Sequence, residues 1–128
     1  MEQLNLRERV LFTANADPAK CMKCGKCSGA CPNYDKMEYH PHQFVSMVLN
    51  GEIEPLLKSE SLYLCLGCMV CVERCPRDVR PARFIEAVRL MQIRQQGENH
   101  LKPEDVAKQI EEDTPQQLLV SAFRKYAK

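Results

Sequence analysis

The sequence lacks the patterns that mark several large classes of protein. Its longest apolar run, Leu62 to Val72, is about half the length of a membrane-spanning helix. It contains no glycine-rich loop that would cradle a phosphate and no fingerprint for flavin or nicotinamide dinucleotides. No stretch alternates polar and apolar residues for long enough to predict a β-strand. A membrane span, a nucleotide site and a β-sheet are therefore not expected.

The charges are nearly balanced, with 18 Lys and Arg against 17 Asp and Glu. This balance gives no support for a nucleic-acid partner, which a basic surface would favour. The residues Met1 to Arg9 carry charge where a secretory signal needs an apolar run, so a cytoplasmic location is expected. The 128 residues are enough for one soluble globular domain with appended helices.

All eight cysteines fall in two copies of one pattern, Cys-x-x-Cys-x-x-Cys-x-x-x-Cys-Pro. The copies are Cys21, Cys24, Cys27, Cys31 with Pro32 (motif one), and Cys65, Cys68, Cys71, Cys75 with Pro76 (motif two). This spacing is typical of the thiolate ligands of a cubane [4Fe–4S] cluster. We therefore predict two [4Fe–4S] clusters and a protein that moves electrons.

The fourth cysteine of each motif is predicted to bind the cluster of the other motif. Three cysteines at steps of three can hold three iron corners from one tight turn, whereas the fourth lies one residue further on and precedes proline. In two-cluster ferredoxins this fourth cysteine ligates the other cluster. The expected ligands are Cys21, Cys24, Cys27 and Cys75 for cluster 1, and Cys65, Cys68, Cys71 and Cys31 for cluster 2. Such crossing would join cluster insertion and folding in one event.

Zinc and disulfides are the alternatives for a cysteine-rich chain. Zinc sites also use Cys-x-x-Cys pairs, but they normally place a long gap after two cysteines. Disulfide frameworks suit short secreted chains. With all eight ligand positions filled by cysteine, His40, His42 and His100 are expected to be structural or surface residues. No ligand is missing and no cysteine is spare, so no catalysis is expected from this chain alone.

Short helices are predicted around the motifs, which makes the fold class all-α. Proline at the first helical position and glycine after the last one mark the boundaries. The predicted helices start at Asp17-Pro18, run from Pro41 to Gly51, from Pro81 to Gly97 and from Pro103 to Glu112, and start again at a capping box at Thr114-Pro115. The terminal helix has an apolar stripe that is either core or a surface for a partner: Leu118, Leu119, Ala122, Phe123 and Tyr126.

Residues beside the cysteines are expected to adjust the sites. Gly25 and Gly67 either let the backbone approach a cluster or serve the turn geometry. Motif two is the more apolar, from Leu64 to Val72, so its main cluster is expected to be the better buried. Cations near each motif would favour the reduced cluster, dock an acidic partner, or simply face water; they are Lys20, Lys23, Lys26, Arg74, Arg77, Arg80 and Arg83.

The motifs and the segments that join them resemble the α-helical ferredoxin superfamily, and within it the C subunit of heterodisulfide reductase. The resemblance covers about residues 14 to 95. The similar segments are Cys24-Gly25-Lys26-Cys27, Tyr39-His40-Pro41, Ser61-Leu62-Tyr63-Leu64-Cys65, Gly67-Cys68, Cys75-Pro76-Arg77 and Arg80-Pro81. The resemblance implies a two-cluster α-helical ferredoxin domain over residues 17–97, an N-terminal extension over 1–16 and a C-terminal helical extension over 98–128.

The resemblance also implies a role and partners. The C subunit of that family relays electrons from a flavin-containing A subunit to a B subunit, so a hetero-oligomer with A- and B-like subunits is expected. Similar subunits accompany class II benzoyl-CoA reductases and methylenetetrahydrofolate reductase assemblies, and a free ferredoxin is a further alternative. A free ferredoxin is usually much more acidic than this chain, which mildly favours a subunit held in a complex.

Overall fold

Every secondary-structure element of the described chain is a helix. The computed structural model describes residues 4–93, 104, 108 and 110–124, and it describes side chains only up to Ser121. The elements are α1 (Leu6–Ala14), the 3₁₀ turn η1 (Pro18–Lys20), α2 (Lys26–Gly29), α3 (Pro41–Asn50), α4 (Ile53–Lys58), α5 (Ser61–Leu64), α6 (Val70–Arg74), α7 (Pro81–Ile93) and α9 (Gln116–Arg124). The described residues form no strand, which confirms the all-α prediction. The chain divides into two units, Met1–Arg94 and Gln95–Lys128.

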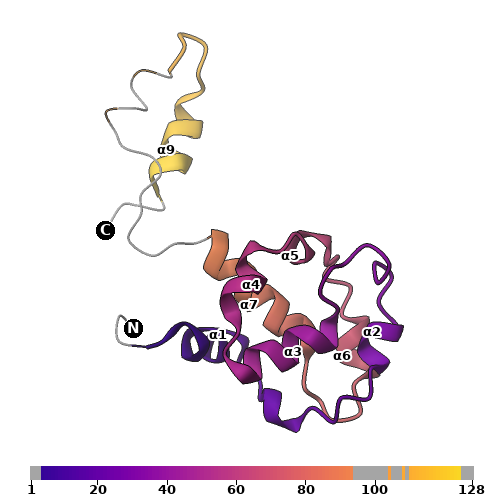
Figure 1. The fold of residues 1–128 in the computed structure, drawn as a ribbon. Helices are drawn as coiled ribbons and strands as arrows, with labels where there is room; N and C mark the ends of the chain where they lie inside the picture. Colours follow the sequence, from indigo (N-terminus) through magenta and orange to yellow (C-terminus); the bar gives the residue numbers. More distant parts are fainter. Residues whose placement is uncertain (1–3, 94–103, 105–107, 109, 125–128) are drawn as a thin grey trace. The chain divides into compact units, whose positions relative to one another are not determined.

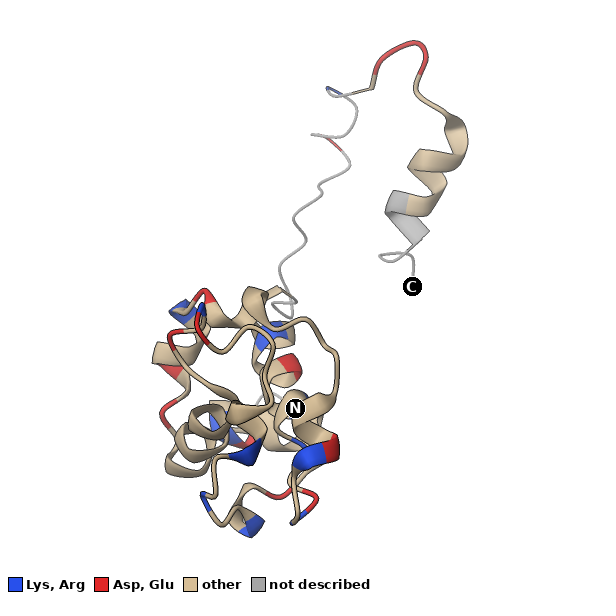
Figure 2. Cartoon of the chain, turned by 90° about the vertical axis from the view of Figure 1, so that its right-hand side faces the viewer, with Lys and Arg blue, Asp and Glu red and all other residues tan. Residues whose placement is uncertain are grey.

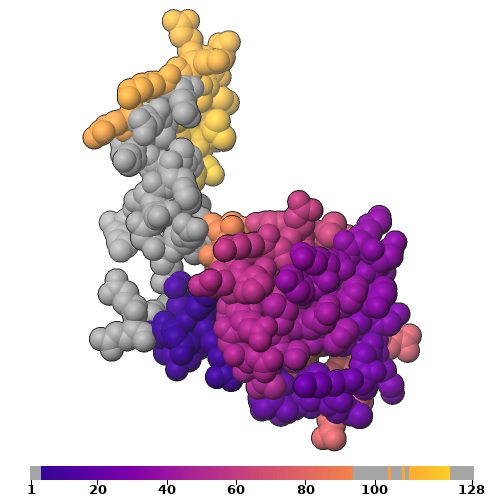
Figure 3. Space-filling model, in the orientation of Figure 1, coloured from indigo at the N-terminus to yellow at the C-terminus, as the bar shows by residue number. Residues whose placement is uncertain are grey.

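Helix α7 is the centre of the first unit (Figure 1). It packs against α1, α3, α4, α5 and α6. Its residues Phe84, Ile85 and Val88 lie in one core with Phe44 and Val48 of α3, and all five are buried. Figure 3 shows that the segments before α7 cover most of it on one face of this unit. Burial of these large side chains supplies the main stabilisation of the fold, about 1.5–3 kcal/mol for each.

Helix α3 begins and ends where the sequence predicts. Pro41 occupies the first helical position, and the His40 backbone N–H donates to Gln43 Oε1 over 2.8 Å. At the other end Gly51 has a left-handed φ of 85°, a conformation that suits glycine because it has no Cβ. The result is a helix capped at both ends, whose first residues line the same cavities as the cysteines.

Helix α1 comes from the segment assigned to an N-terminal extension. Asn5 caps it: its side chain accepts the Glu8 N–H, and the Glu8 carboxylate accepts the Asn5 N–H. Val10 and Ala14 are buried in the core that α7 and α3 share. The first compact unit therefore includes this helix.

In the second unit, α9 begins at Gln116, close to its predicted start. The capping box differs from the prediction, because the Thr114 hydroxyl accepts the Glu111 N–H instead. Leu118 of the predicted stripe is exposed. The predicted helix from Pro103 to Glu112 and the predicted end at Gly97 lie largely or wholly outside the described residues.

Candidate metal centres

The two cysteine motifs adopt the same backbone turn. In each, the residues before and after the second cysteine have a left-handed φ: 57° at Lys23 and 75° at Gly25, then 67° at Gly67 and 62° at Met69. Each turn leads directly into a short helix, α2 or α6, and these two helices pack together (Figure 1). Each motif thus has one glycine at its two left-handed positions. In motif one the glycine follows the second cysteine, and in motif two it precedes the second cysteine.

The left-handed backbone conformation of the turns explains why glycine occurs at positions 25 and 67. A Cβ added to either glycine would meet no protein atom within 4 Å, so crowding by the protein is not the reason for glycine. A non-glycine residue in this conformation costs about 1–2 kcal/mol. Lys23 and Met69 bear that strain in the present chain.

Gly25 and Met69 occupy the same place in the two motifs and predict opposite mutational effects. Gly25→Ala should destabilise the protein by about 1 kcal/mol because alanine disfavours a left-handed φ. Met69→Gly should be neutral or stabilising, since strain relief competes with the greater freedom of glycine in the unfolded chain. Urea unfolding under anaerobic conditions, followed by circular dichroism, measures both. Equal losses for the two variants would contradict the assignment of strain to Met69.

The eight cysteines line two separate cavities, four in each. The first cavity is lined by Cys21, Cys24, Cys27 and Cys75, together with Met22, Gly25, His42, Val45, Pro76, Arg77, Val79 and Pro81. The second is lined by Cys31, Cys65, Cys68 and Cys71, together with Pro32, Asn33, Met37, Pro41, Leu66, Met69, Ala82 and Ile85. The two cavities are similar in size, because the space free of protein atoms at each, open solvent included, is about 340 and 360 Å³. Each set of cysteines therefore includes one residue from the other motif.

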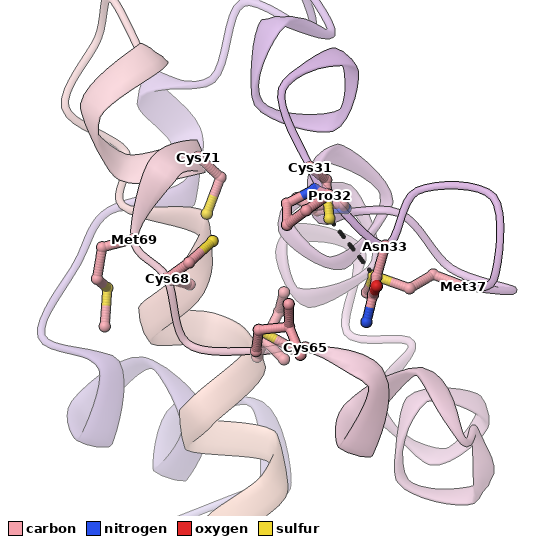
Figure 4. Close-up of a pocket in the computed structure, with 12 residues that line it drawn as sticks. Cys31, Pro32, Asn33, Met37, Cys65, Cys68, Met69 and Cys71 are labelled. Atoms are coloured by element: carbon pink, nitrogen blue, oxygen red, sulfur yellow. Dashed lines mark hydrogen bonds between the residues drawn. The ribbon is translucent and has the colours of Figure 1, made fainter.

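In the second cavity, Cys31 lies across from the turn that carries Cys68 and Cys71 (Figure 4). The sulfur atoms of Cys68 and Cys71 point toward the space between the segments. The Cys31 thiol contacts the Met37 thioether over 3.8 Å, drawn as the dashed line in Figure 4. The second cavity is thus a space between two chain segments that are far apart in the sequence.

Exposure of the cysteines follows the same pattern in both motifs. Cys27 and Cys71 are each 8% exposed, and Cys24 and Cys68 are exposed. The predicted better burial of motif two is not found, because Leu66 and Met69 lie 66% and 42% exposed at its outer side.

Burial raises the pKa of the Cys27 thiol and raises that of Cys71 to about 11. Since metal ligation requires thiolates, metal binding must overcome this desolvation.

Two side chains that the sequence did not suggest hold the segment around Cys65 in place. Asn33, two residues after Cys31, donates from Nδ2 to the Leu64 carbonyl over 2.7 Å. Arg89 of α7 donates from Nε to the Leu62 carbonyl over 2.7 Å and from its terminal nitrogen to the Cys65 carbonyl over 2.9 Å. These bonds join motif one and α7 to the start of motif two, which brings Cys31 and Cys65 to one cavity.

His42 lies at the wall of the first cavity, and its Nδ1 is hydrogen-bonded to the hydroxyl of Ser28, which directly follows Cys27. The backbone N–H of His42 donates to the same hydroxyl over 3.2 Å. Burial, with a smaller contribution from His40, lowers the pKa of His42, so the ring is neutral near pH 7. His42 is therefore structural, as predicted, and it also faces the cavity.

His40 is held by aromatic stacking. Its ring stacks on Tyr34, with ring centroids 3.9 Å apart and planes 14° apart. The stack joins the loop after Cys31 to the start of α3. It gives His40 the structural role that the sequence analysis expects.

Cations gather near the first cavity more than near the second. Arg77 lines the first cavity, whereas no described residue that lines the second is Lys, Arg, Asp or Glu. Asp78 follows Arg77, and its pKa is lowered by a hydrogen bond from Arg80 and by the charges of Arg80, Lys20 and Arg83. Lys20, before motif one, and Arg80 and Arg83, after motif two, therefore lie near one carboxylate. Figure 2 shows Lys and Arg interspersed with Asp and Glu on this unit, without a continuous field of one sign.

The donor set fits the cofactor that the sequence predicts. Each cavity offers four free cysteines, and a cubane [4Fe–4S] cluster requires four thiolates. The remaining lining is mainly apolar or backbone, which would limit access of water. Among the described residues, no three His, Cys, Asp or Glu side chains converge as they would on a single metal ion.

Comparison with known proteins agrees with this donor set. The family model described as a 4Fe-4S dicluster domain matches residues 20–80. The C2 subunit of the H2/formate:CoB-CoM heterodisulfide, ferredoxin reductase of Methanococcus maripaludis is 36% identical over 69 residues, 54% of this chain and 37% of that protein. The C subunit of the ferredoxin:CoB-CoM heterodisulfide reductase of Methanosarcina acetivorans is 35% identical over 74 residues, 58% of this chain and 30% of that protein.

A relative from a different kind of enzyme also matches. The probable glycolate oxidase iron-sulfur subunit of Bacillus subtilis is 38% identical over 77 residues, which cover 54% of this chain and 17% of that protein. The chain spans between 30% and 53% of the length of the heterodisulfide reductase relatives that it matches.

The helical fold, the two cysteine-lined cavities and the matched domain define an all-α iron–sulfur domain with cysteines for two [4Fe–4S] clusters. Within that class, the matched part of the chain is similar to the C subunits of heterodisulfide reductases. In the described part of the chain, no helix is both long and apolar enough to span a bilayer.

Proposed function

We propose that this chain is an electron-relay subunit whose two cavities hold the two clusters with crossed ligands. Cluster 1 takes Cys21, Cys24, Cys27 and Cys75, and cluster 2 takes Cys65, Cys68, Cys71 and Cys31. The observation that carries the assignment is the lining of the cavities, which groups the cysteines in these two sets. Each cluster, when bound, accepts and returns one electron.

The helix starts keep the two cavities adjacent. Pro41 faces the second cavity and His42 the first, and likewise Ala82 faces the second and Pro81 the first. Cys27 and Cys71, one from each set, share a small buried cluster with Ala82. The protein between the two sites is therefore only a few side chains thick, which supports transfer of an electron from one site to the other.

The proposed partners are proteins that resemble the A and B subunits of heterodisulfide reductase. The names of the relatives support this, since those proteins are subunits of heterodisulfide reductases. The exposed side chains of Leu66 and Met69, beside the second cavity, offer an apolar surface for such contact. The chain would work in the cytoplasm as part of a hetero-oligomer and would catalyse no reaction alone.

A second candidate is a relay subunit of another oxidoreductase. The similarity to a probable glycolate oxidase iron-sulfur subunit favours it, because the matched domain occurs beside different chemistry there. The relay role is the same in both candidates, and the partners differ. Class II benzoyl-CoA reductase and methylenetetrahydrofolate reductase assemblies remain alternatives of this kind.

Anaerobic purification of the tagged chain from its native cells tests the proposal. We expect about eight iron and eight sulfide per chain, broad absorbance near 400 nm, and co-eluting redox subunits that mass spectrometry identifies. Co-elution with flavin-containing and catalytic subunits of the heterodisulfide reductase type would support the first candidate. A chain that runs alone with full iron would be a free ferredoxin, and zinc without iron would overturn both candidates.

A further inference from the structure

We infer that the cluster held by Cys21, Cys24, Cys27 and Cys75 has the higher reduction potential, so that an electron shared by the pair resides at the first cavity. This inference rests on the proposed relay function and adds a direction to it. One electron leaves the second site and enters the first, and no bond forms or breaks. Hydrogen bonds and cations near the cysteines carry the argument.

Backbone donors point at the sulfur atoms of the first set. The Lys23 N–H donates to Cys21 Sγ over 3.4 Å, and the Val79 N–H donates to Cys75 Sγ over 3.4 Å. A reduced cluster carries more negative charge than an oxidised one, so donors to its sulfur ligands stabilise the reduced state. Two of the four cysteines at the first cavity thus have a donor that raises the potential.

Ser28 adds a hydroxyl at a third cysteine. Its Oγ lies 4.0 Å from Cys27 Sγ, and the side chain is almost fully buried. When Cys27 is a thiolate it can only accept, so the Ser28 O–H is drawn toward sulfur.

His42 completes this arrangement by supplying the other hydrogen bond of Ser28. With the Ser28 proton directed to Cys27, the hydroxyl oxygen can accept from the His42 backbone N–H and from a proton on Nδ1 of the ring. Both donors come from the first turn of α3, which holds the hydroxyl in place. His42 is thus a positioning residue that acts on cluster 1 through Ser28.

The second set has fewer donors. A backbone N–H of Ala82 acts on Cys71. The Cys31 sulfur contacts Met37, whose thioether has no proton to donate to a thiolate. The residue after Cys71, which corresponds to Ser28 in motif one, is Val72, and it has no hydroxyl.

Charge acts in the same direction as the hydrogen bonds. Arg77 lines the first cavity, and the exposed Lys23 and Lys26 flank its cysteines in the chain. None of the described residues that line the second cavity is charged, although the Arg89 guanidinium donates to the Leu62 carbonyl and to the carbonyl of the ligand residue Cys65. Positive charge stabilises the more negative, reduced site. An electron donor would therefore dock beside the second cavity and an acceptor beside the first.

The exchange of Ser28 and Val72 tests the inference. Both midpoint potentials of the fully loaded, purified chain are measured by anaerobic potentiometric titration with EPR and visible detection. Ser28→Val should lower the higher midpoint only, and Val72→Ser should raise the lower midpoint only. A tenfold change in the ratio of oxidised to reduced cluster at a fixed potential corresponds to about 59 mV for one electron, and we expect shifts up to that size.

Two further variants keep the test decisive if Val72→Ser loads poorly. Ser28→Ala should lower the same midpoint as Ser28→Val, and His42→Ala should lower it by less, because the hydroxyl remains but loses its orienting partner. A shift of the lower midpoint by Ser28→Val or Ser28→Ala, or no shift of either midpoint, would overturn the inference. Iron near eight per chain with cubane signals in every variant separates this failure from a failure of the proposed function.

Discussion

Cys31→Ser is expected to remove the cluster of motif two and to leave that of motif one in place. Cys31 lines the same cavity as Cys65, Cys68 and Cys71, so its loss leaves the second site with three thiolates. Iron should fall from about eight to about four per chain. The reduced protein should show one cubane EPR signal in place of two interacting ones.

Matched variants identify which cluster is lost. Cys68→Ser removes an undisputed member of the second set, so the remaining EPR signal of Cys31→Ser should match that of Cys68→Ser. Cys75→Ser should match Cys24→Ser in the same way, since both line the first cavity. A Cys31→Ser spectrum that matches Cys24→Ser would mean that each motif holds its own fourth ligand, and the crossed assignment would be wrong.

Arg89→Met should destabilise the protein and weaken the second site selectively. The guanidinium donates to the Leu62 and Cys65 carbonyls, and methionine of similar length leaves both carbonyls without that donor. Hydrogen bonds to a charged group contribute about 1.5–3 kcal/mol each, so we expect a loss of about 3 kcal/mol. Urea unfolding under anaerobic conditions measures it. Iron loss during mild chelation should begin with the cluster that Cys31→Ser also removes.

Arg83→Met is the matched control, because Arg83 lies on the same helix with an exposed side chain. A surface substitution of this kind changes stability by no more than about 0.5 kcal/mol. Equal destabilisation by the two variants would show that the helix, rather than the two carbonyl bonds, is sensitive to the change. Equal chelation rates for both clusters in Arg89→Met would contradict its role at Cys65.

Local patterns predicted much of the fold. Pro41 and Gly51 bound α3 as expected, Pro81 begins α7, and the Asp17 side chain caps the turn that starts at Pro18. Each of these signals acts through the backbone of its own few residues, so a sequence contains it completely. The grouping of cysteines into two sets also follows from spacing, and it stays a prediction until ligand variants test it.

The contacts that position the site were not predicted, because they join residues far apart in the chain. Asn33 binds a carbonyl 31 residues away, and Arg89 binds carbonyls 27 and 24 residues away. An Asn in a loop or an Arg on a helix has no local pattern that names such a partner. Ser28 and His42 are likewise joined only when α2 and α3 pack together.

The sequence of helix α1 contains a capping pattern that predicts the start of this helix. Asn5 and Glu8 have the spacing of a capping box, and Val10 and Ala14 follow on one face. The high charge of this segment obscured the small apolar face that α7 covers. Two buried residues are a weak periodic pattern in a nine-residue helix, so the apolar spacing was not decisive.

With the proposed ligands, neither motif is an independent binding unit. Each cavity is lined by three cysteines from one motif and one cysteine from the other. A fragment that ends near Gly51 would therefore contain half of the cysteines and no complete site. This fragment and the remainder of the chain, expressed together, would need to associate before either could retain iron. With this ligation, a protein that received only one of the two motifs would lack the fourth thiolate of that motif's site.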